Sequence, residues 1–331
     1  MEFPGRVAVF GSGSWATALV KILLNNLRHV NWYIRKQETI DFIREHHHNP
    51  SYISSITFDI SRIDFFTDPA EAIRQSDLLI FAIPSAFLKD TLEPAQADLT
   101  GKFIVSAIKG IVPEDNLTIA EYFNRHFNVP FNSIGVITGP SHAEEIAMEK
   151  LTYLTIASKS QQRADALAAL IGCWYVKTIT THDIYGVEYA GVLKNIFAIA
   201  AGISHGLGYG DNFQAVLVSN AIQEGKRFLD KTYKSKRKLY SSAYLGDLLV
   251  TTYSQFSRNR TFGAMLGKGY PVKAAQMEMS MIAEGYYSSK CIHELNETFG
   301  VKMPIADTVY SILYEKETPH TAIKLLTEKL K

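Results

Sequence analysis

The chain has little of what marks secreted, metal-bound or membrane proteins. Only two of its 331 residues are cysteines, Cys173 and Cys291, too few for a disulfide framework and without metal-ligand spacing. The 34 basic and 33 acidic side chains nearly cancel, which argues against broad binding of nucleic acid or anionic membranes. No apolar run reaches the ~18 residues of a membrane span without charged or turn residues. No basic segment, apolar stretch and cleavage site precede the first predicted strand. We therefore expect a cytoplasmic protein with no metal, nucleic acid or membrane insertion.

The order of apolar segments predicts an α/β domain followed by an all-α domain. At 331 residues the chain is long for one core, so two domains are expected. Strands are predicted at residues 6–10, 30–34, 63–66, 78–83, 103–107, 134–138, 152–157 and 175–179. The near-continuous apolar character of the strands at 63–66, 78–83, 103–107 and 134–138, with helical patterns between them, favours a parallel sheet covered on both faces. We therefore predict a doubly wound, Rossmann-like sheet. From about residue 183 the pattern is helical, so we predict domains at 1–182 and 183–331.

The first predicted strand runs into a glycine-rich turn. Gly11-x-Gly13 opens a dinucleotide-binding fingerprint, in which one glycine makes the tight turn and the next lets the backbone approach a pyrophosphate. Ala16 replaces the third glycine, which close helix–strand packing tolerates. Arg35 and Lys36 follow the second strand where an NAD site usually has an acid, so the pattern leaves NAD and NADP both open.

Residues 187–203 predict a helix that is buried on nearly every side. Gly191, Lys194, Asn195, Ala198 and Gly202 share one face, so a lysine projects from small residues where a backbone or a flat ligand can approach. A buried lysine usually has an anion or a chemical task. The alternative is a core helix whose lysine reaches the surface.

Polar residues at other turns complete a candidate site. Lys109 leaves the strand at 103–107, and Ser141 is a candidate cap in the turn GPSHAEE. Asp247 is placed to cap a helix or to pair with a lysine. Ser257, Arg258, Asn259 and Arg260 are suited to a phosphate, because arginine forms bidentate, charge-assisted hydrogen bonds.

Two other clusters are given plainer interpretations. His46, His47 and His48 have no second ligand cluster at suitable spacing, so we do not expect them to bind metal. The basic run at 231–238 is short and isolated, so we expect a solvated loop. Glu284 is a lone carboxylate in a predicted helix, open to capping, ion-pairing or a ribose contact.

Seven segments, taken in order, resemble the bacterial type of NAD(P)-dependent glycerol-3-phosphate dehydrogenase. They are GSGSWATAL, PSAFL, SAIKGI, TGPSHAEEIA, GVEYAGVLKNIFAIAAGISHGLGYGDN, LGDLLVTTYSQFSRNRTFG and AEGYYSSK. Ala16 departs from the family, which commonly has glycine there. The resemblance implies hydride transfer between a nicotinamide and C2 of sn-glycerol 3-phosphate, giving dihydroxyacetone phosphate and, in the other direction, glycerol 3-phosphate for phospholipid synthesis.

The resemblance also implies roles for individual residues. Lys194 would be the general acid/base, with Lys109 a second cation and Asp247 orienting both lysines. Cofactor contacts would be made, beside Gly11 and Gly13, by Ser14, Trp15, Arg35, Lys109, Ala143, Arg258 and Glu284. Substrate contacts would be made by Lys109, Gly139, Ser141, Lys194, Asp247, Ser257, Arg258 and Asn259.

Two other functions compete with this interpretation. A β-hydroxyacid-type dehydrogenase shares the predicted domains and the helix-borne lysine, but a plain hydroxy acid does not need residues 257–260. A sensor that binds NAD(P)H without turnover does not need Lys109, Lys194 and Asp247. A helical second domain also makes a homodimer an expectation.

Overall fold

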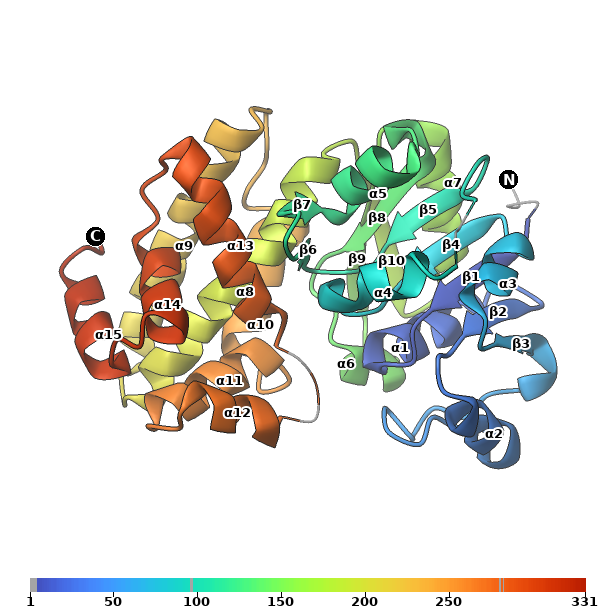
Figure 1. The fold of residues 1–331 in the computed structure, drawn as a ribbon, viewed down its shortest axis with the longest axis horizontal. Coiled ribbons are helices and arrows are strands. Elements are labelled where there is room, and N and C mark those ends of the chain that lie inside the picture. Colours follow the sequence, from blue (N-terminus) through green and yellow to red (C-terminus); the bar gives the residue numbers. More distant parts are fainter. Residues whose placement is uncertain (1–4, 96–97, 280, 282) are drawn as a thin grey trace. The chain divides into compact units, whose positions relative to one another are not determined.

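The computed structural model describes residues 5–95, 98–279, 281 and 283–331. The chain forms two compact units (Figure 1). The sheet unit comprises Met1–Ile108 and Ile119–Ile184, and the helical unit comprises Lys109–Thr118 and Tyr185–Lys331. The helical unit thus includes a ten-residue excursion, 109–118, that interrupts the sheet unit in sequence. The predicted domains, 1–182 and 183–331, did not include residues 109–118 in the helical part.

The sheet unit is built on eight strands. They are β1 (Val7–Phe10), β2 (Val30–Tyr33), β3 (Ile63–Phe66), β4 (Leu78–Phe81), β5 (Phe103–Ser106), β8 (Ile134–Thr138), β9 (Thr152–Ser158) and β10 (Val176–Thr181). Their order is β10-β9-β8-β5-β4-β1-β2-β3, so the direction of winding reverses beside β1. This is the doubly wound arrangement, and every predicted strand overlaps an observed one.

The direction of the last two strands was not predicted. β9 runs antiparallel to β8, with Thr138 opposite Thr155. β10 is parallel to β9, so the last two strands run against the other six. Apolar strand composition does not specify direction, because strands buried on both faces have the same pattern in either orientation.

Helices cover both faces of this sheet (Figure 1). They are α1 (Ser14–Leu23), α2 (Gln37–His46), α3 (Pro69–Arg74), α4 (Leu88–Leu92), α5 (Ile119–Phe127), α6 (Ala143–Ala147) and α7 (Gln161–Ile171), with short 3-10 turns at Ile60–Arg62, Ser85–Phe87 and Phe131–Ser133. Val7 and Val9 of β1 share a core with α1, α6 and α7. Phe10 points to the opposite face, where it stacks on Phe81, which contacts Phe123 of α5.

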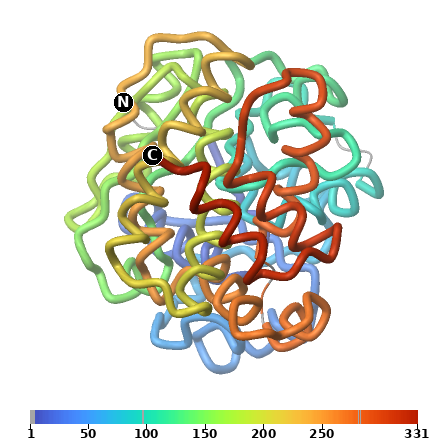
Figure 2. Tube along the Cα trace, turned by 90° about the vertical axis from the view of Figure 1, so that its left-hand side faces the viewer, coloured from blue at the N-terminus to red at the C-terminus, as the bar shows by residue number. Residues whose placement is uncertain are grey.

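The helical unit contains the remaining helices. They are α8 (Ile184–Gly206), α9 (Asp211–Thr232), α10 (Asp247–Tyr253), α11 (Arg258–Gly267), α12 (Val272–Glu278), α13 (Glu284–Phe299), α14 (Pro304–Tyr314) and α15 (Pro319–Thr327). The excursion adds a small antiparallel hairpin, β6 (Ile111–Val112) and β7 (Leu117–Thr118). The last helices, α14 and α15, lie side by side (Figures 1 and 2). Within the described part of the chain, α8 alone is long and apolar enough to cross a membrane, and 94% of its apolar window is buried in the protein.

Small residues let α8 and α11 pack backbone to backbone. A Cβ atom added at Gly202 of α8 would overlap the backbone oxygen of Arg260 in α11. Gly263 of α11 meets the backbone oxygen of Ile199 in the same way. The expected close approach of a second backbone to the small-residue face of this helix is therefore confirmed, and it fixes the start of α11 beside α8.

Candidate active site

The buried lysine of α8 lies in a cluster assembled from three parts of the helical unit. Lys194 comes from the middle of α8, Lys109 opens the excursion that forms the hairpin, and Asp247 is the first residue of α10. A π-helical turn, Ser242–Gly246, runs directly into α10 and sets the position of Asp247. Such turns are rare and often occur at functional sites.

One carboxylate pairs with both lysines. Asp247 accepts a hydrogen bond from Lys194 through Oδ1, while its Oδ2 lies 3.3 Å from the Nζ atom of Lys109. Asp247 is 1% exposed and Lys194 is 6% exposed. Of the two predicted roles for Asp247, pairing with a lysine is the one observed. When both lysines are protonated, two cations face one carboxylate, and the excess positive charge favours an anion.

Burial has the largest effect on the pKa of Lys194. It lowers the pKa of the amine, and the charge of Lys109 lowers it further. Asp247 opposes both effects, and the resulting pKa of Lys194 is about 7. A lysine with this pKa exchanges a proton readily near neutral pH, which an ordinary surface lysine does not.

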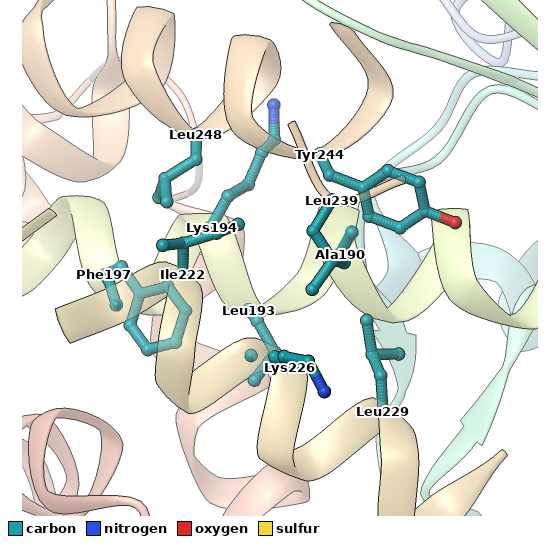
Figure 3. A pocket seen from close by; sticks show the side chains of 12 residues that line it. Ala190, Leu193, Lys194, Phe197, Ile222, Lys226, Leu229, Leu239, Tyr244 and Leu248 are labelled. Atoms are coloured by element: carbon teal, nitrogen blue, oxygen red, sulfur yellow. The ribbon is translucent and has the colours of Figure 1, made fainter. Parts of the chain in front are cut away.

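The aliphatic part of Lys194 borders an apolar cavity of about 30 Å³ (Figure 3). The cavity lies between α8, α9 and the segment that leads into α10, and its lining includes Phe197, Ile222 and Leu248. In Figure 3 the Lys194 nitrogen lies at the far end of the side chain from Ile222. The apolar lining of the cavity therefore lies along the stem of the lysine, while its nitrogen points to Asp247 and Thr251.

A chain of amides links the elements around the lysines. Asn195 donates a 2.7 Å hydrogen bond through Nδ2 to the backbone oxygen of Lys109. Its Oδ1 accepts a 2.9 Å bond from Asn259, whose own Oδ1 accepts one from the backbone N–H of Gly285. Asn195 and Asn259 thus tie together the hairpin segment, α8 and the first turns of α11 and α13.

The predicted phosphate residues form the start of α11. Ser257 caps this helix by accepting a 3.3 Å hydrogen bond from the backbone N–H of Arg260. Arg258 and Asn259 are the first two helical residues, where backbone N–H groups have no partner within a helix. These N–H groups, the positive end of the helix dipole and a guanidinium suit a phosphate.

The glycine turn of the sheet unit has the conformation its sequence predicts. Gly11 has a φ of +127°, and a Cβ there would lie 2.6 Å from the backbone oxygen of Ala82. Gly13 precedes the first residue of α1, and a Cβ there would meet open space. The side chain of Asn49 braces the turn by donating to the backbone oxygen of Ser12 at 2.9 Å and to Thr17 at 3.0 Å.

This turn fits a dinucleotide. α1 offers its N-terminus beside an unobstructed backbone, which is the arrangement that holds a pyrophosphate. The indole Nε1 of Trp15 is buried and has no hydrogen-bond partner among the described residues. Ala16 is fully buried in the core, as expected for the small residue at the third glycine position. Arg35 is exposed just beyond β2.

A second turn in the sheet unit follows β8. Gly139 has a φ of +109°, and a Cβ there would lie 2.9 Å from the backbone oxygen of Tyr153. Ser141 was expected to cap the next helix, and this was wrong. His142 holds the capping position of α6, while the Ser141 hydroxyl donates to the backbone oxygen of Gly139 at 2.9 Å. Ala143 is the first residue of α6.

The structure distributes the predicted residues over the two units. The helical unit brings Lys109, Lys194 and Asp247 into contact and carries Ser257, Arg258, Asn259 and Glu284. The sheet unit carries Gly11, Gly13, Ser14, Trp15, Arg35, Gly139, Ser141 and Ala143, all beyond the carboxyl ends of strands.

Sequence reasoning missed Thr251. Its hydroxyl accepts a 3.0 Å hydrogen bond from Lys194 and donates one of 2.6 Å to the backbone oxygen of Asp247. The spacing of four residues from Asp247 was the available signal, because it places both side chains on one helix face. Asn195 was placed on the right face, but no role was predicted for it.

The histidine run serves other contacts. The ring of His46 packs on Phe42 with centroids 4.2 Å apart, and Nδ1 of His47 lies 3.3 Å from the backbone oxygen of Phe58. Across residues 5–95, 98–279, 281 and 283–331, no group of three or more histidine, cysteine, aspartate or glutamate residues is placed to hold a metal.

A doubly wound sheet with a glycine turn after its first strand, in a chain whose helical unit buries a lysine–carboxylate pair, is typical of a nicotinamide-dependent dehydrogenase. Comparison with known proteins gives the family. Residues 6–164 match the family model for the N-terminus of NAD-dependent glycerol-3-phosphate dehydrogenase, and residues 183–324 match that for its C-terminus. The chain belongs to this family.

Individual relatives agree with the family models. A glycerol-3-phosphate dehydrogenase (NAD(P)+) of Bacillus velezensis is 35% identical over 98% of this chain and 95% of its own. The enzyme of the same name from Bacillus subtilis is 35% identical over 97% of this chain and 93% of its own. A crystal structure of glycerol-3-phosphate dehydrogenase from Coxiella burnetii superposes with a TM-score of 0.91 at 28% identity, covering 98% of both chains. D-mandelate dehydrogenase, at 15% identity and a TM-score of 0.61 over 94% of this chain and 98% of its own, shares the fold alone.

Proposed function

We propose that this chain interconverts sn-glycerol 3-phosphate and dihydroxyacetone phosphate by hydride transfer, with NAD or NADP as the cofactor. Membership of the family supports the reaction class, the phosphorylated small-molecule substrate and the cofactor class. The observation that carries the proposal is the pairing of Asp247 with both Lys194 and Lys109. A supply of glycerol 3-phosphate for phospholipid synthesis is consistent with this reaction.

Lys194 is the general acid/base of this proposal. When bound, the nicotinamide ring supplies or accepts the hydride at C2 of the substrate. In ketone reduction the Lys194 ammonium donates a proton to the oxygen on C2, and in alcohol oxidation the neutral amine takes it back. A pKa of about 7 leaves both forms populated at neutral pH. The hydrogen bonds that the amine donates to Asp247 and Thr251 fix its position.

Lys109 and Asp247 complete the electrostatics. The charge of Lys109 stabilises negative charge as it develops on the substrate oxygen. Asp247 balances the two lysines and orients them, so that the cluster is held together before a substrate binds. Because the three groups interact closely, their proton equilibria are coupled.

The substrate phosphate is assigned to the start of α11. Ser257, Arg258 and Asn259 lie there, and the backbone N–H groups of the first turn add to the guanidinium. The side-chain oxygen of Asn259 accepts a hydrogen bond from Gly285. We therefore propose that Asn259 donates to the phosphate through its second amide hydrogen or its backbone N–H. Gly139 and Ser141 are further proposed substrate contacts.

The cofactor is assigned to the glycine turn and its surroundings. Gly11, Gly13, Ser14 and Trp15 hold the pyrophosphate side, and the unobstructed backbone at Gly13 fits this role. Arg35 stands at the end of β2, where it suits a 2′-phosphate without excluding a 2′-hydroxyl. Lys109, Ala143, Arg258 and Glu284 are the other proposed contacts.

The remaining assignments concern surroundings and assembly. We propose a cytoplasmic homodimer that neither binds nucleic acid nor inserts into a membrane. The near-neutral composition supports the absence of nucleic acid, and the burial of α8 supports its role as a core helix.

The test of this function is the decrease in nicotinamide absorbance when purified protein is mixed with dihydroxyacetone phosphate and either NADH or NADPH. Oxidation of either cofactor is expected, and the ratio of the two kcat/KM values reports the cofactor preference at Arg35. Hydroxy acids such as 3-hydroxybutyrate, tested with NAD and NADP, provide the comparison. Turnover of a hydroxy acid without turnover of the triose phosphate would overturn the proposal.

A further inference from the structure

The hairpin excursion belongs to the helical unit even though the sheet unit flanks it in sequence. The chain enters the helical unit at Lys109 and leaves it after Thr118. Ile111 and Val112 of β6 are 0% and 1% exposed, and they pair with Thr118 and Leu117 of β7. Lys109 therefore sits at the base of a small, buried structure that packs with the helices.

Two side-chain amides hold this structure at its opposite ends. At the base, Asn195 of α8 binds the backbone oxygen of Lys109 at 2.7 Å. At the tip, Nδ2 of Asn116 donates a 3.0 Å hydrogen bond to Oε2 of Glu294 in α13. Asn116 has a φ of +53°, a left-handed conformation that asparagine adopts more readily than most residues. The hairpin turn thus aims this amide at α13.

We propose that Asn116 and Glu294 are positioning residues, which anchor the hairpin on α13 and thereby hold Lys109 against Asp247. The inference rests on the proposed function, because the reaction needs Lys109 in place. Lys109 joins the buried pair from a segment with only two short strands, which by themselves are a weak support. The bond at the tip adds a second attachment to the one at the base, so that Lys109 is held against Asp247 before a ligand binds.

The pKa of Lys194 depends on the position of Lys109. Burial lowers the pKa of Lys194, and the Lys109 charge lowers it further. The titratable groups that face Lys194 are Lys109 from the hairpin and Asp247 from α10, while Tyr244 and Lys226 line the same cavity. A loosened hairpin moves Lys109 away, and the pKa of Lys194 then rises. A merely structural contact on α13 would not produce this shift.

The informative variants separate the anchor from the hairpin backbone. Asn116→Gly removes the amide but tolerates the left-handed conformation. Glu294→Ala removes the acceptor, whereas Glu294→Gln keeps an oxygen that accepts from Asn116. Lys290→Ala is the matched control, because Lys290 Nζ lies 3.7 Å from Glu294 Oε1 on the same helix and is not the partner of the Asn116 amide.

The experiment measures kcat, KM and their pH dependence for the five proteins, together with a lysine-selective ¹³C NMR titration of Lys194 that needs no turnover. Asn116→Gly and Glu294→Ala are expected to lower kcat about 10-fold to 100-fold, with KM for the cofactor near the wild-type value and a raised Lys194 pKa. Glu294→Gln and Lys290→Ala are expected to match the wild type. Because Glu294 is only partly buried, its variants test the anchor even if Asn116→Gly does not fold.

The outcomes distinguish the anchor from the function. Wild-type pKa and kcat in both Asn116→Gly and Glu294→Ala would overturn the positioning role while leaving the reaction intact. Equal losses in Glu294→Gln and Glu294→Ala would overturn it too, since the hydrogen bond is then not what matters. A raised Lys194 pKa in a protein that turns over no triose phosphate would support the anchor and overturn the proposed function.

Discussion

Lys194 donates a 3.0 Å hydrogen bond to the hydroxyl of Thr251. That hydroxyl donates to the backbone of its own helix, so it faces the lysine as an acceptor. An ammonium group has three hydrogens, and Asp247 takes another of them. The third N–H is the one that we propose faces the substrate oxygen, as a proton donor must.

Removal of the amine tests this role directly. Lys194→Ala is expected to lower kcat by ~10²–10⁴, because the proton donor and acceptor is lost while the glycine turn is untouched. Nucleotide affinity, measured by fluorescence titration with NADH and NADPH, should stay near the wild-type value. Lys231→Ala, in the exposed basic run, is the control for the loss of a lysine. Weakened nucleotide binding with normal turnover at saturation would remove Lys194 from the chemistry.

The low pKa of Lys194 predicts opposite pH profiles in the two directions. Alcohol oxidation needs the neutral amine, so its kcat/KM should rise as pH increases through about 7. Ketone reduction needs the ammonium form, so its kcat/KM should fall over the same interval. Initial rates from roughly pH 5.5 to 9 in both directions give these limbs. Profiles that bend only near the pKa of an ordinary lysine would contradict the assignment.

Arg258 tests the phosphate assignment. Arg258→Ala is expected to raise the substrate KM by ~10²-fold or more, because a charge-assisted contact to a phosphate is lost from both ground and transition states. Lys268→Ala removes a cation from the other end of α11 and should leave KM unchanged. Inorganic phosphate should also inhibit the wild type competitively and the variant less. An unchanged KM in Arg258→Ala would place the phosphate elsewhere.

The sequence was most informative where local pattern and chemistry coincide. The strand positions, the glycine turn and the small-residue face of α8 all follow from side-chain periodicity and from glycine geometry. The antiparallel direction of β9 and the excursion at 109–118 depend on long-range packing, which a local pattern does not contain. Thr251 was missed because its spacing from Asp247 indicates a shared helix face but does not show that Lys194 of another helix lies opposite that face.

Gly202 tests the backbone contact that positions α11. Gly202→Ala is expected to destabilise the protein by about 3 kcal/mol or more, because its Cβ would meet the backbone oxygen of Arg260, which has no freedom to rotate away. Gly225→Ala is the control, since the nearest atoms to its Cβ would be side-chain carbons at 3.8 and 3.9 Å. That change should stabilise α9 by up to about 1 kcal/mol. Urea unfolding measures both, and equal behaviour would contradict the close packing of α8 and α11.

Glu224 predicts a pH-dependent stability that is separate from catalysis. This carboxyl group is fully buried and accepts hydrogen bonds of 3.0 and 2.9 Å from the backbone N–H groups of Ile305 and Ala306, at the start of α14. Burial raises its pKa most strongly, the two hydrogen bonds lower it in part, and the result is a pKa of about 8. Glu224→Ala should destabilise the protein by about 2–3 kcal/mol, because two N–H groups lose their acceptors.

The sign of the pH effect follows from the raised pKa. The folded protein holds a proton on Glu224 up to about pH 8, whereas the unfolded chain releases it near the ordinary glutamate value of 4.5. The contribution of Glu224 is therefore complete below that value and is lost as pH rises towards 8. Glu224→Gln, which cannot ionise, should lack this slope, and Glu297→Ala at an exposed position should keep it. Parallel stability curves for the wild type and Glu224→Gln between these pH values would show that the buried carboxyl group is already ionised under α14.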